Sequence, residues 1–433
     1  MNRFSITKGL RIFGWMTVLL LGASLTAQAA IDGITGTKNP DGTVVFNLVA
    51  RKGNISTSDG DSFQMWGYAV GNRVQYPGPT LIVSQGDRIM VRLKNALPAT
   101  AGNTSITFPG HQVSARGGVA GTLTREAPPD GATQVIYEFT ATEPGTYLYR
   151  SGTRPDLQVE MGLVGALIVR PGGGPDPAHH AYNHADSYFD QEYLYFITEM
   201  DPWIHRQVEF TPASAVDTTK YFPTNWFING RNWPDVMSPA FAKWLPTQPY
   251  NCVLRMHPGQ KILVRLVGGG RDIHPMHLHG NNFWVIAEDG RMFSSNPGVS
   301  GADLAWSDVT YKIAAGRTAD AIWSWNAEKL GWDIYGHAPG DPMEPGEYAP
   351  DHGKPFPVVL PTRDSMTYGP FYSGSPFLGA GGDLPPGDPG LNANAGYFYM
   401  WHSHTEKELT SNDIWPGGLV SFMIIEHPNV PIP

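Results

Sequence analysis

Short apolar or alternating segments, separated by Gly and Pro, constrain the fold of this chain more than any other feature. Such segments occur at residues 42–50, 81–83, 88–93, 133–140, 145–149, 163–169, 192–197, 261–266, 282–287 and 420–425. Alternation with a period of two is typical of half-buried strands. The 433 residues include 50 Gly and 38 Pro, and no segment of useful length has a helical period. The chain is therefore predicted to be all-β and to form β-sandwiches.

A weak internal repeat divides the chain into two halves. Residues 79–91 are similar to residues 256–264, because each has a turn that leads into an apolar strand. We predict a first domain over residues 30–170, a Gly/Pro-rich linker over 171–189 and a second domain over 190–433. Residues 336–396 hold 24 Gly or Pro among 61 residues, which predicts a long irregular insertion in the second domain.

The first thirty residues have the pattern of a secretory signal peptide. Basic residues precede an apolar run over residues 12–23, and Ala27-Gln28-Ala29 offers small residues for cleavage. The run is too short for a comfortable membrane span. We expect residues 1–29 to be removed and the mature chain to be periplasmic or secreted, with no membrane span. An uncleaved anchor is the alternative.

The composition limits the classes of binding partner and excludes disulfide bonds within the chain. The net charge of −9 makes the chain a poor candidate for nucleic-acid binding. Cys252 is the only cysteine, so no intrachain disulfide can form, although export normally permits disulfides. The fold must therefore be held by its apolar core or by a metal.

Histidines are concentrated in two motifs, His274-Pro275-Met276-His277-Leu278-His279 and His402-Ser403-His404. Residues two apart on a strand point to the same face. Each motif can therefore present a pair of imidazoles, and two pairs on adjacent strands would form a four-imidazole pocket. Imidazole suits copper, zinc, iron and nickel. One pair alone would be an ordinary polar surface, whereas two pairs favour a metal site.

These motifs resemble those of the multicopper oxidase family. The similar segments are residues 76–81 with Gly86-Asp87, 145–149 and 158–169 for a first cupredoxin domain, and residues 229–231, 274–280 and 401–404 for the copper-bearing last domain. The resemblance covers nearly all of residues 40–430 apart from the insertion. Two domains rather than three are similar to the two-domain laccase branch. The resemblance implies two cupredoxin-like Greek-key β-sandwiches.

The resemblance also implies an oxidoreductase that takes electrons from a small reductant or metal ion and reduces O2 to water. In the family, a mononuclear blue copper bound by two His and one Cys accepts the electrons. A trinuclear copper cluster held by eight histidines, half of them from the first domain, reduces O2. Two-domain laccases place this cluster between the subunits of a homotrimer, so the resemblance implies a homotrimer in which Arg150 of a neighbour faces the histidines.

Several positions depart from the family pattern at the blue-copper site. Ser403 stands where the resemblance implies the cysteine, and a neutral hydroxyl does not replace a thiolate. Glu408 and Asp413 stand where the second histidine and the axial methionine would lie, so that His274 alone remains of that site. Cys252 lies outside the motif and is expected to be a small buried hydrophobe.

The first domain lacks the histidines that the resemblance implies. The first His-x-His pair should follow residues 104–106, where the chain reads Thr107-Phe108-Pro109-Gly110-His111, and the second should follow Tyr149, where it reads Arg150-Ser151-Gly152. His111 is nearby but out of register. The second domain keeps its half. The predicted metal ligands are His277, His279, His402, His404 and His274, for copper with fewer than four ions per chain, or for zinc. Asp272, His337, His352 or Glu406 could complete the shell.

Three functions stay open at this stage. The first is an exported multicopper-oxidase-like protein that binds copper at the retained histidines, with or without oxidoreductase activity. The second is a non-catalytic envelope protein that stores or delivers copper or serves as a scaffold. The third is a full four-copper oxidase whose ligands lie elsewhere in the sequence. No catalytic residue is assigned.

Overall fold

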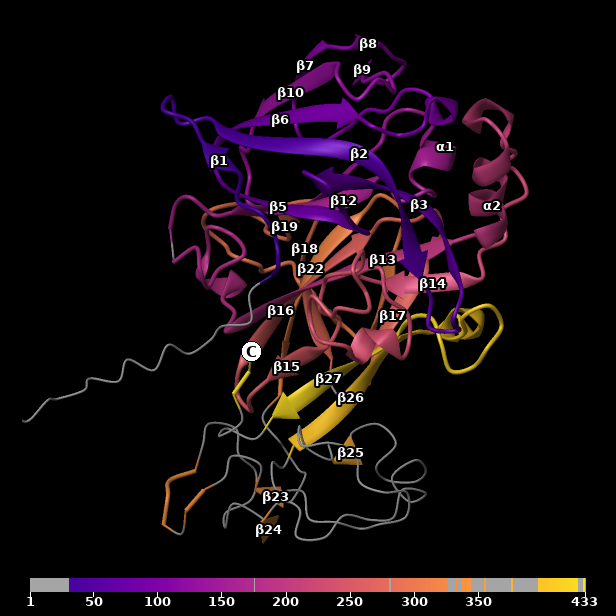
Figure 1. Ribbon diagram of the computed structural model, residues 1–433. Helices are drawn as coiled ribbons and strands as arrows, with labels where there is room; N and C mark the ends of the chain where they lie inside the picture. Colours follow the sequence, from indigo (N-terminus) through magenta and orange to yellow (C-terminus); the bar gives the residue numbers. More distant parts are fainter. Residues whose placement is uncertain are drawn as a thin grey trace, which may run out of the picture.

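The computed structural model describes residues 31–174, 176–279, 282–325 and 396–426, with short pieces at 332–333, 337–338, 340–343, 354–355, 375–376 and 431–432. Within these residues, four main sheets pair into two β-sandwiches, drawn one above the other in Figure 1. The predicted signal peptide lies outside the described residues, as does nearly all of the predicted insertion.

The first sandwich packs a larger mixed sheet against a smaller one, in indigo and purple in Figure 1. The larger sheet has the order β4 (Arg73–Val74), β3 (Ser62–Val70), β2 (Val44–Ser56), β6 (Arg88–Asn95), β10 (Gln134–Thr140) and β7 (Ser114–Gly117), with β1 (Thr37–Lys38) beside β2. The smaller sheet has the order β11 (Gly145–Arg150), β12 (Val164–Arg170) and β5 (Gly78–Ser84). A separate ribbon pairs β8 (Val119–Ala120) with β9 (Arg125–Glu126).

The second sandwich has the same plan. One sheet has the order β14 (Asn225–Ile228), β13 (Gln191–Met200), β16 (Lys261–Gly268), β22 (Thr318–Ser324), β18 (Phe283–Glu288) and β19 (Arg291–Met292), with β20 (Trp306–Asp308) beside β18. The facing sheet has the order β15 (Leu254–Met256), β27 (Val420–Glu426), β26 (Gly396–Ser403), β17 (His274–Leu278) and β21 (Thr310–Ile313), with β25 (Ser375–Pro376) beside β26. β23 (Trp332–Asp333) pairs with β24 (Lys354–Pro355).

All ten segments predicted as strands fall on strands, and the predicted repeat is confirmed by the pairing. In the first sandwich β5 is parallel to β12 and β6 is parallel to β2; in the second, β15 is parallel to β27 and β16 is parallel to β13. Each of the two similar segments, residues 79–91 and 256–264, therefore runs from a strand in one sheet into a strand of the facing sheet. The domain limits at 30, 170, 190 and 433 stay a prediction.

One helix was not expected from the sequence. α2 (Pro202–Phe210) follows β13 and packs on β3, with α1 (Pro155–Gln158) the other α-helix among the described residues. The Asp201 side chain accepts a hydrogen bond from the Trp203 backbone N–H at 2.9 Å, which satisfies a free donor at the start of α2. Pro202 at the first position has no N–H to satisfy. Short 3₁₀ turns lie at Ala99–Ala101, Ala185–Ser187, Ala213–Ala215, Asp235–Met237 and Glu406–Leu409.

Two kinds of buried contact join the sandwiches. Leu148 and Ile168 from the first sandwich share an apolar cluster with Phe196 and Phe227 from the second. A polar network lies beside this cluster. Its centre is Asp320 on β22, which accepts hydrogen bonds from the hydroxyls of Thr146 on β11 and Tyr182, both at 2.5 Å.

The same network holds a buried guanidinium. Arg265 on β16 donates to Thr146 Oγ1 and to Glu192 Oε2, both at 3.0 Å, and its Nη1 lies 3.6 Å from Asp320 Oδ1. Arg170 of the first sandwich pairs with the same Glu192. Because these groups are buried, each charge depends on its partners for stability.

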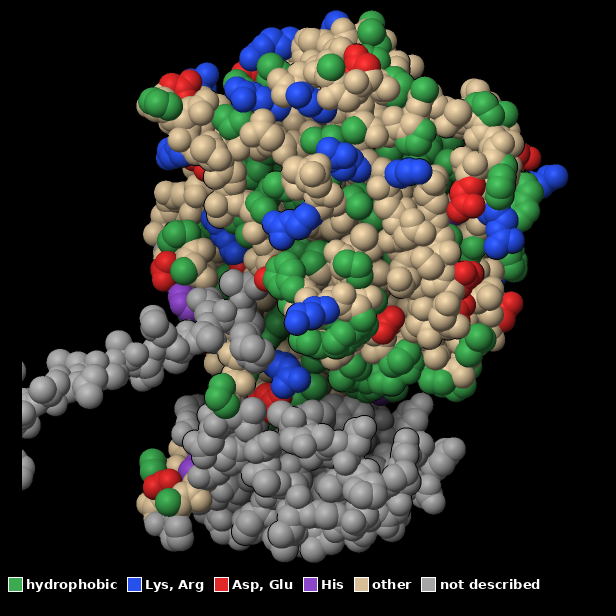
Figure 2. Space-filling view, in the orientation of Figure 1, with side chains coloured by type: hydrophobic (Ala, Val, Ile, Leu, Met, Phe, Trp, Pro, Cys, Tyr) green, Lys and Arg blue, Asp and Glu red, His purple; other side chains and the backbone are tan. Residues whose placement is uncertain are grey.

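On the face in Figure 2, single basic and acidic side chains are interspersed. None of the helices in the part of the chain that the structure describes has the length and apolar composition that a membrane crossing requires.

Replacing Asp320 with alanine is expected to lower the free energy of unfolding by about 3 kcal/mol, because it leaves two buried hydroxyl donors without their acceptor and removes one of the two carboxylates beside the buried Arg265 guanidinium. Urea unfolding measures the change. Glu209→Ala on the exposed side of α2 is the control and should change stability by less than about 0.5 kcal/mol. Equal effects of the two substitutions would contradict the role of the network.

Candidate metal centre

The two histidine motifs lie on neighbouring antiparallel strands of the second sandwich. β17 pairs with β26 so that His277 is directly opposite His402, with Met276 opposite Ser403 and Leu278 opposite Trp401. Residues that are directly opposite each other share a face of the sheet. Met276, Leu278, Trp401 and Ser403 are buried on the inner face. His277 and His402 therefore project together from the outer face.

Four imidazoles gather on that outer face. The ring centroids of His277 and His404 are 4.6 Å apart, those of His279 and His402 are 4.9 Å apart, and those of His402 and His404 are 5.1 Å apart. One ring nitrogen each of His277, His279 and His402 lies within 4.8 Å of the other two. His402 is buried, His277 and His279 are half-buried, and His404 is exposed.

The electrostatic setting keeps the rings of His277, His279 and His402 neutral. Burial, with the neighbouring imidazoles, lowers the pKa of His279 to about 4. Burial and the same neighbours also lower the pKa of His277, and burial lowers the pKa of His402. A neutral imidazole is the form that binds a metal ion, so the site does not have to release protons before it binds one at neutral pH.

Hydrogen bonds orient two of the rings. Nδ1 of His277 lies 2.7 Å from Thr310 Oγ1, and Nδ1 of His402 lies 2.7 Å from the Ser403 carbonyl oxygen. Metal-binding histidines commonly use their second nitrogen in this way. Nε2 is then the nitrogen with which each ring can bind an ion. Nε2 of His402 lies 3.0 Å from Nε2 of His279, a hydrogen bond that a bound ion would replace. The donor set therefore fits an ion that prefers imidazole nitrogen, such as copper or zinc.

His274 lies apart from the other four predicted ligands. It is three residues before His277, so its side chain points to the inner face of β17, and it is fully buried. Its Nε2 is 2.9 Å from Glu199 Oε2 and its Nδ1 is 3.0 Å from Glu408 Oε2. Both ring nitrogens are thus occupied by carboxylates.

Three of the four residues at the positions that the resemblance assigns to the blue-copper ligands lie together: His274, Ser403 and Glu408. Ser403 Oγ donates to Glu408 Oε2 at 2.5 Å, and the same oxygen contacts His274. Asp413 is exposed in a turn with φ 62°. Cys252 is buried, and its thiol lies 3.1 Å from the Ile228 carbonyl oxygen; burial raises its pKa to about 12.

Glu199 was not identified from the sequence. It lies on β13, in the sheet that faces β17, and its second oxygen accepts hydrogen bonds from Tyr221 Oη at 2.8 Å and from the backbone N–H groups of Arg271 and Asp272. A side chain at Gly270 would collide with this carboxylate, so glycine leaves the space that Glu199 occupies. We call His274, Ser403, Glu408 and Glu199 the inner network.

The pKa values within the inner network follow from these bonds. Burial alone would lower the pKa of His274, but the hydrogen bonds to Glu199 and Glu408 outweigh it and raise that pKa to about 9. Burial opposes the ionisation of Glu199, yet the bond to His274 holds its pKa below the ordinary value. At neutral pH the pair is therefore an imidazolium and a carboxylate.

The first-domain segments that the resemblance aligns with histidine pairs also meet each other. The backbones of Thr107 and Arg150 exchange two hydrogen bonds, at 2.7 and 3.1 Å. Ser105 Oγ is 2.9 Å from Thr153 Oγ1 and accepts from the Gly152 N–H at 3.1 Å. Hydroxyl groups that bond one another therefore lie at this place in the first sandwich.

The four residues proposed to complete the metal shell differ in their distance from the imidazole cluster and in whether the structure describes them. Glu406 is exposed and near enough to His402 to act on its pKa, whereas Asp272 is exposed beside the inner network. His337 lies in a short described piece, and His352 lies outside the described residues.

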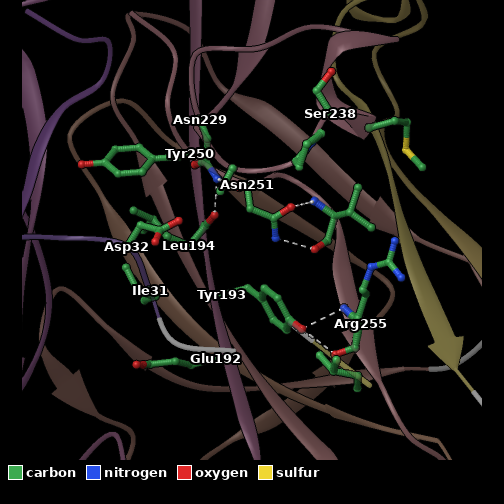
Figure 3. A pocket seen from close by; sticks show the side chains of 15 residues that line it. Ile31, Asp32, Glu192, Tyr193, Leu194, Asn229, Ser238, Tyr250, Asn251 and Arg255 are labelled. Atoms are coloured by element: carbon green, nitrogen blue, oxygen red, sulfur yellow. Dashed lines mark hydrogen bonds between the residues drawn. The ribbon is translucent and has the colours of Figure 1, made fainter. Parts of the chain in front are cut away.

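A cavity of about 690 Å³ lies elsewhere in the second sandwich, and no histidine lines it. In Figure 3, Tyr193 and Asn251 bond the backbone of other residues that line the cavity. The Tyr193 hydroxyl bonds the Arg255 backbone, at 2.6 Å to the carbonyl oxygen and 3.0 Å to the N–H, and Asn251 bonds the Val253 backbone. The imidazole cluster is therefore separate from this cavity.

A pair of β-sandwiches with a histidine cluster defines a class of metal-binding β proteins. Matches to protein-family models identify the family within this class. Two models described as multicopper oxidase match residues 50–173 and 217–322, which together make just over half of the chain. The chain belongs to the multicopper oxidase family. The family implies copper as the cofactor.

Individual relatives are more distant. Oxidoreductase ptaE of Pestalotiopsis fici is 26% identical over 260 residues, which are 58% of this chain and 38% of the relative. The iron transport multicopper oxidase fetC of Epichloe festucae is 26% identical over 255 residues, 58% of this chain and 34% of the relative. The matches thus span little more than a third of these relatives.

A solved structure shows the same cupredoxin-like two-domain fold. The blue copper oxidase from Nitrosomonas europaea superposes with a TM-score of 0.54 at 18% identity, over 88% of this chain and 85% of that chain. The expectation of two cupredoxin-like sandwiches is confirmed.

In the metal-free protein, His274 is expected to titrate near pH 9 instead of near its ordinary value of 6.5. Because the folded pKa is raised, the stabilisation from its charge is fully present below pH 6.5 and is lost as the pH rises through about 9. NMR of the histidine ring protons measures the titration. Glu408→Gln should move the pKa of His274 downward, and a wild-type pKa at or below 6.5 would contradict the assignment.

Proposed function

We propose that this protein is an exported member of the multicopper oxidase family that binds copper through His277, His279, His402 and His404. One observation carries the proposal: three neutral imidazoles from two paired strands present ring nitrogens within 4.8 Å of one another. Nitrogen ligands in this number satisfy copper without help from the other domain, and zinc is the alternative ion. The stoichiometry is proposed to be one ion per chain, fewer than the four of the full family pattern.

The ligand set is proposed to be a degenerate form of the family pattern. Ser403 offers no thiolate, and Glu408 offers a carboxylate where the resemblance implies an imidazole. The only thiol is Cys252, whose raised pKa disfavours the thiolate that copper would need. In the first sandwich, hydroxyl groups and Arg150 stand where histidines would complete a trinuclear cluster.

Bound copper would supply one-electron redox chemistry. The chain itself holds the rings of His277, His279 and His402 neutral, and it orients two of them through Thr310 and the Ser403 carbonyl group. The exposed His404 leaves one side of the cluster open to small molecules. O2 and a small reductant or metal ion are the proposed reactants, in keeping with relatives named as iron transport oxidases. No four-electron relay through a blue copper is proposed.

A second candidate is copper storage or delivery without turnover, and the exposure of His404 also supports it. A half-open site exchanges its ion with the surroundings more readily than a closed one. A periplasmic or secreted location rests on the predicted signal peptide, and assembly as a homotrimer rests on the family resemblance alone.

Metal analysis of the purified protein with electron paramagnetic resonance tests the proposal. About one copper per chain with a nitrogen-rich signal and no intense thiolate absorption is the expected result. Turnover of a phenolic or metal substrate by that protein would favour the oxidase over storage. Four coppers with an intense blue absorption would overturn the degenerate assignment, and absence of any metal would favour a scaffold.

His277→Ala and His402→Ala are expected to abolish stoichiometric copper uptake, because each removes one of the three nitrogens that lie closest together. Isothermal titration with Cu(II) measures the loss. His180→Ala, whose ring bonds the Asp176 carbonyl group in the linker, should bind copper as the unchanged protein does. Unaltered uptake in the first two variants would place the ion elsewhere.

A further inference from the structure

The inner network links β17 and β26 on their inner face, which is the face opposite to the imidazole cluster. His274 begins β17, three residues before His277, and Glu408 follows His404 by four residues. Ser403 ends β26 and lies between His402 and His404, with its side chain on the inner face. The bonds among these residues therefore connect the start of β17 to the end of β26.

Hydrogen-bond chemistry fixes the protonation of this network. An ionised carboxylate only accepts hydrogen bonds, so a ring that bonds Glu199 through one nitrogen and Glu408 through the other must carry a proton on both. His274 is thus an imidazolium between two carboxylates. Charge-assisted bonds of this kind are stronger and more directional than neutral ones.

The network also extends to the facing sheet. Glu199 comes from β13 and is itself held by Tyr221 Oη and by two backbone N–H groups. Glu408 is held by Ser403, whose Oγ in turn accepts from the Thr405 N–H at 3.1 Å. Both carboxylates that bond His274 are therefore held in place by other groups. The His274 ring, which lies between them, has little freedom to turn.

A second metal ion does not fit this arrangement. The two carboxylates approach opposite nitrogens of one ring, so they cannot both reach one ion that His274 also binds. Among the described residues, the group of His, Cys, Asp and Glu close enough to share an ion is His277, His279 and His402. The ring nitrogens of His274 and the carboxylates of the inner network therefore satisfy one another without a metal ion.

We propose that Glu199 and Glu408, acting through His274, are positioning residues for the imidazole cluster. By fixing the inner face of β17 to the inner face of β26 and to β13, they hold His277 opposite His402 on the outer face. This inference rests on the proposed function, since it assigns the network to the metal site. Neither carboxylate touches the ion; their effect reaches it through strand position.

Glu199→Gln and Glu408→Gln test this inference in the full chain. Each amide keeps the shape of the side chain but removes the charge that holds the imidazolium. We expect each to weaken Cu(II) binding about tenfold and to alter the nitrogen hyperfine pattern of the bound copper, as losses behind a metal site commonly do. In the metal-free variants, the His274 proton signals should titrate at lower pH.

Glu426→Gln is the matched control, because Glu426 is a fully buried carboxylate on β27 that pairs with Arg255 in the same sheet, away from the imidazoles. It should lose comparable stability and keep the copper affinity and spectrum unchanged. Ser403→Ala removes the two hydrogen bonds of the Ser403 hydroxyl but leaves both carboxylates and their charges in place, so it gives a milder variant if the glutamine variants do not fold. Its copper affinity should fall several-fold.

The outcomes separate the two proposals. If the glutamine variants lose stability but bind copper with unchanged affinity and spectrum, the positioning role is overturned and the proposed function stands. If the unchanged protein takes up no copper while His274 titrates near pH 9, the proposed function fails together with the positioning role, and the network is a stabilising ion cluster only.

Discussion

The antiparallel pairing of β17 with β26 is the constraint on which the rest of the site depends. One register places His277 opposite His402 and Met276 opposite Ser403. Because side chains alternate between the faces of a sheet, a slip of one residue would exchange the imidazoles with the apolar residues of the core. The core itself opposes such a slip, since Trp401 stacks on Phe283 with ring centroids 5.6 Å apart.

Burial has opposite consequences on the two faces of these strands. On the outer face it makes the charged form of imidazole costly and lowers the pKa values of His277 and His279, so these rings stay neutral. On the inner face the same cost is outweighed by two carboxylates, and His274 stays charged. The chain thus holds identical side chains, a few residues apart, in different protonation states at one pH.

The strands and the placement of each histidine pair on one face could be predicted from the sequence because both depend on local periodicity. The separation of His274 from His277 was also readable, since residues three apart on a strand face opposite sides. That the two pairs meet, and that Glu408 lies near His274, was implied by the family resemblance. Glu199 had no such signal, because it lies 75 residues away from His274 in the chain. α2 was missed because nine residues with a Pro start have little helical period, and its stability depends on the Asp201 cap and on packing against β3.

Gly270 carries a consequence for how this protein can change during evolution. A side chain there would collide with the carboxylate of Glu199, which four hydrogen bonds hold in place. A relative that acquires a larger residue at this position must therefore displace, shorten or replace the side chain at residue 199. Residues 199 and 270 are therefore expected to change together. A chain that keeps the buried glutamate at 199 in place needs glycine at 270, whereas a chain without it does not.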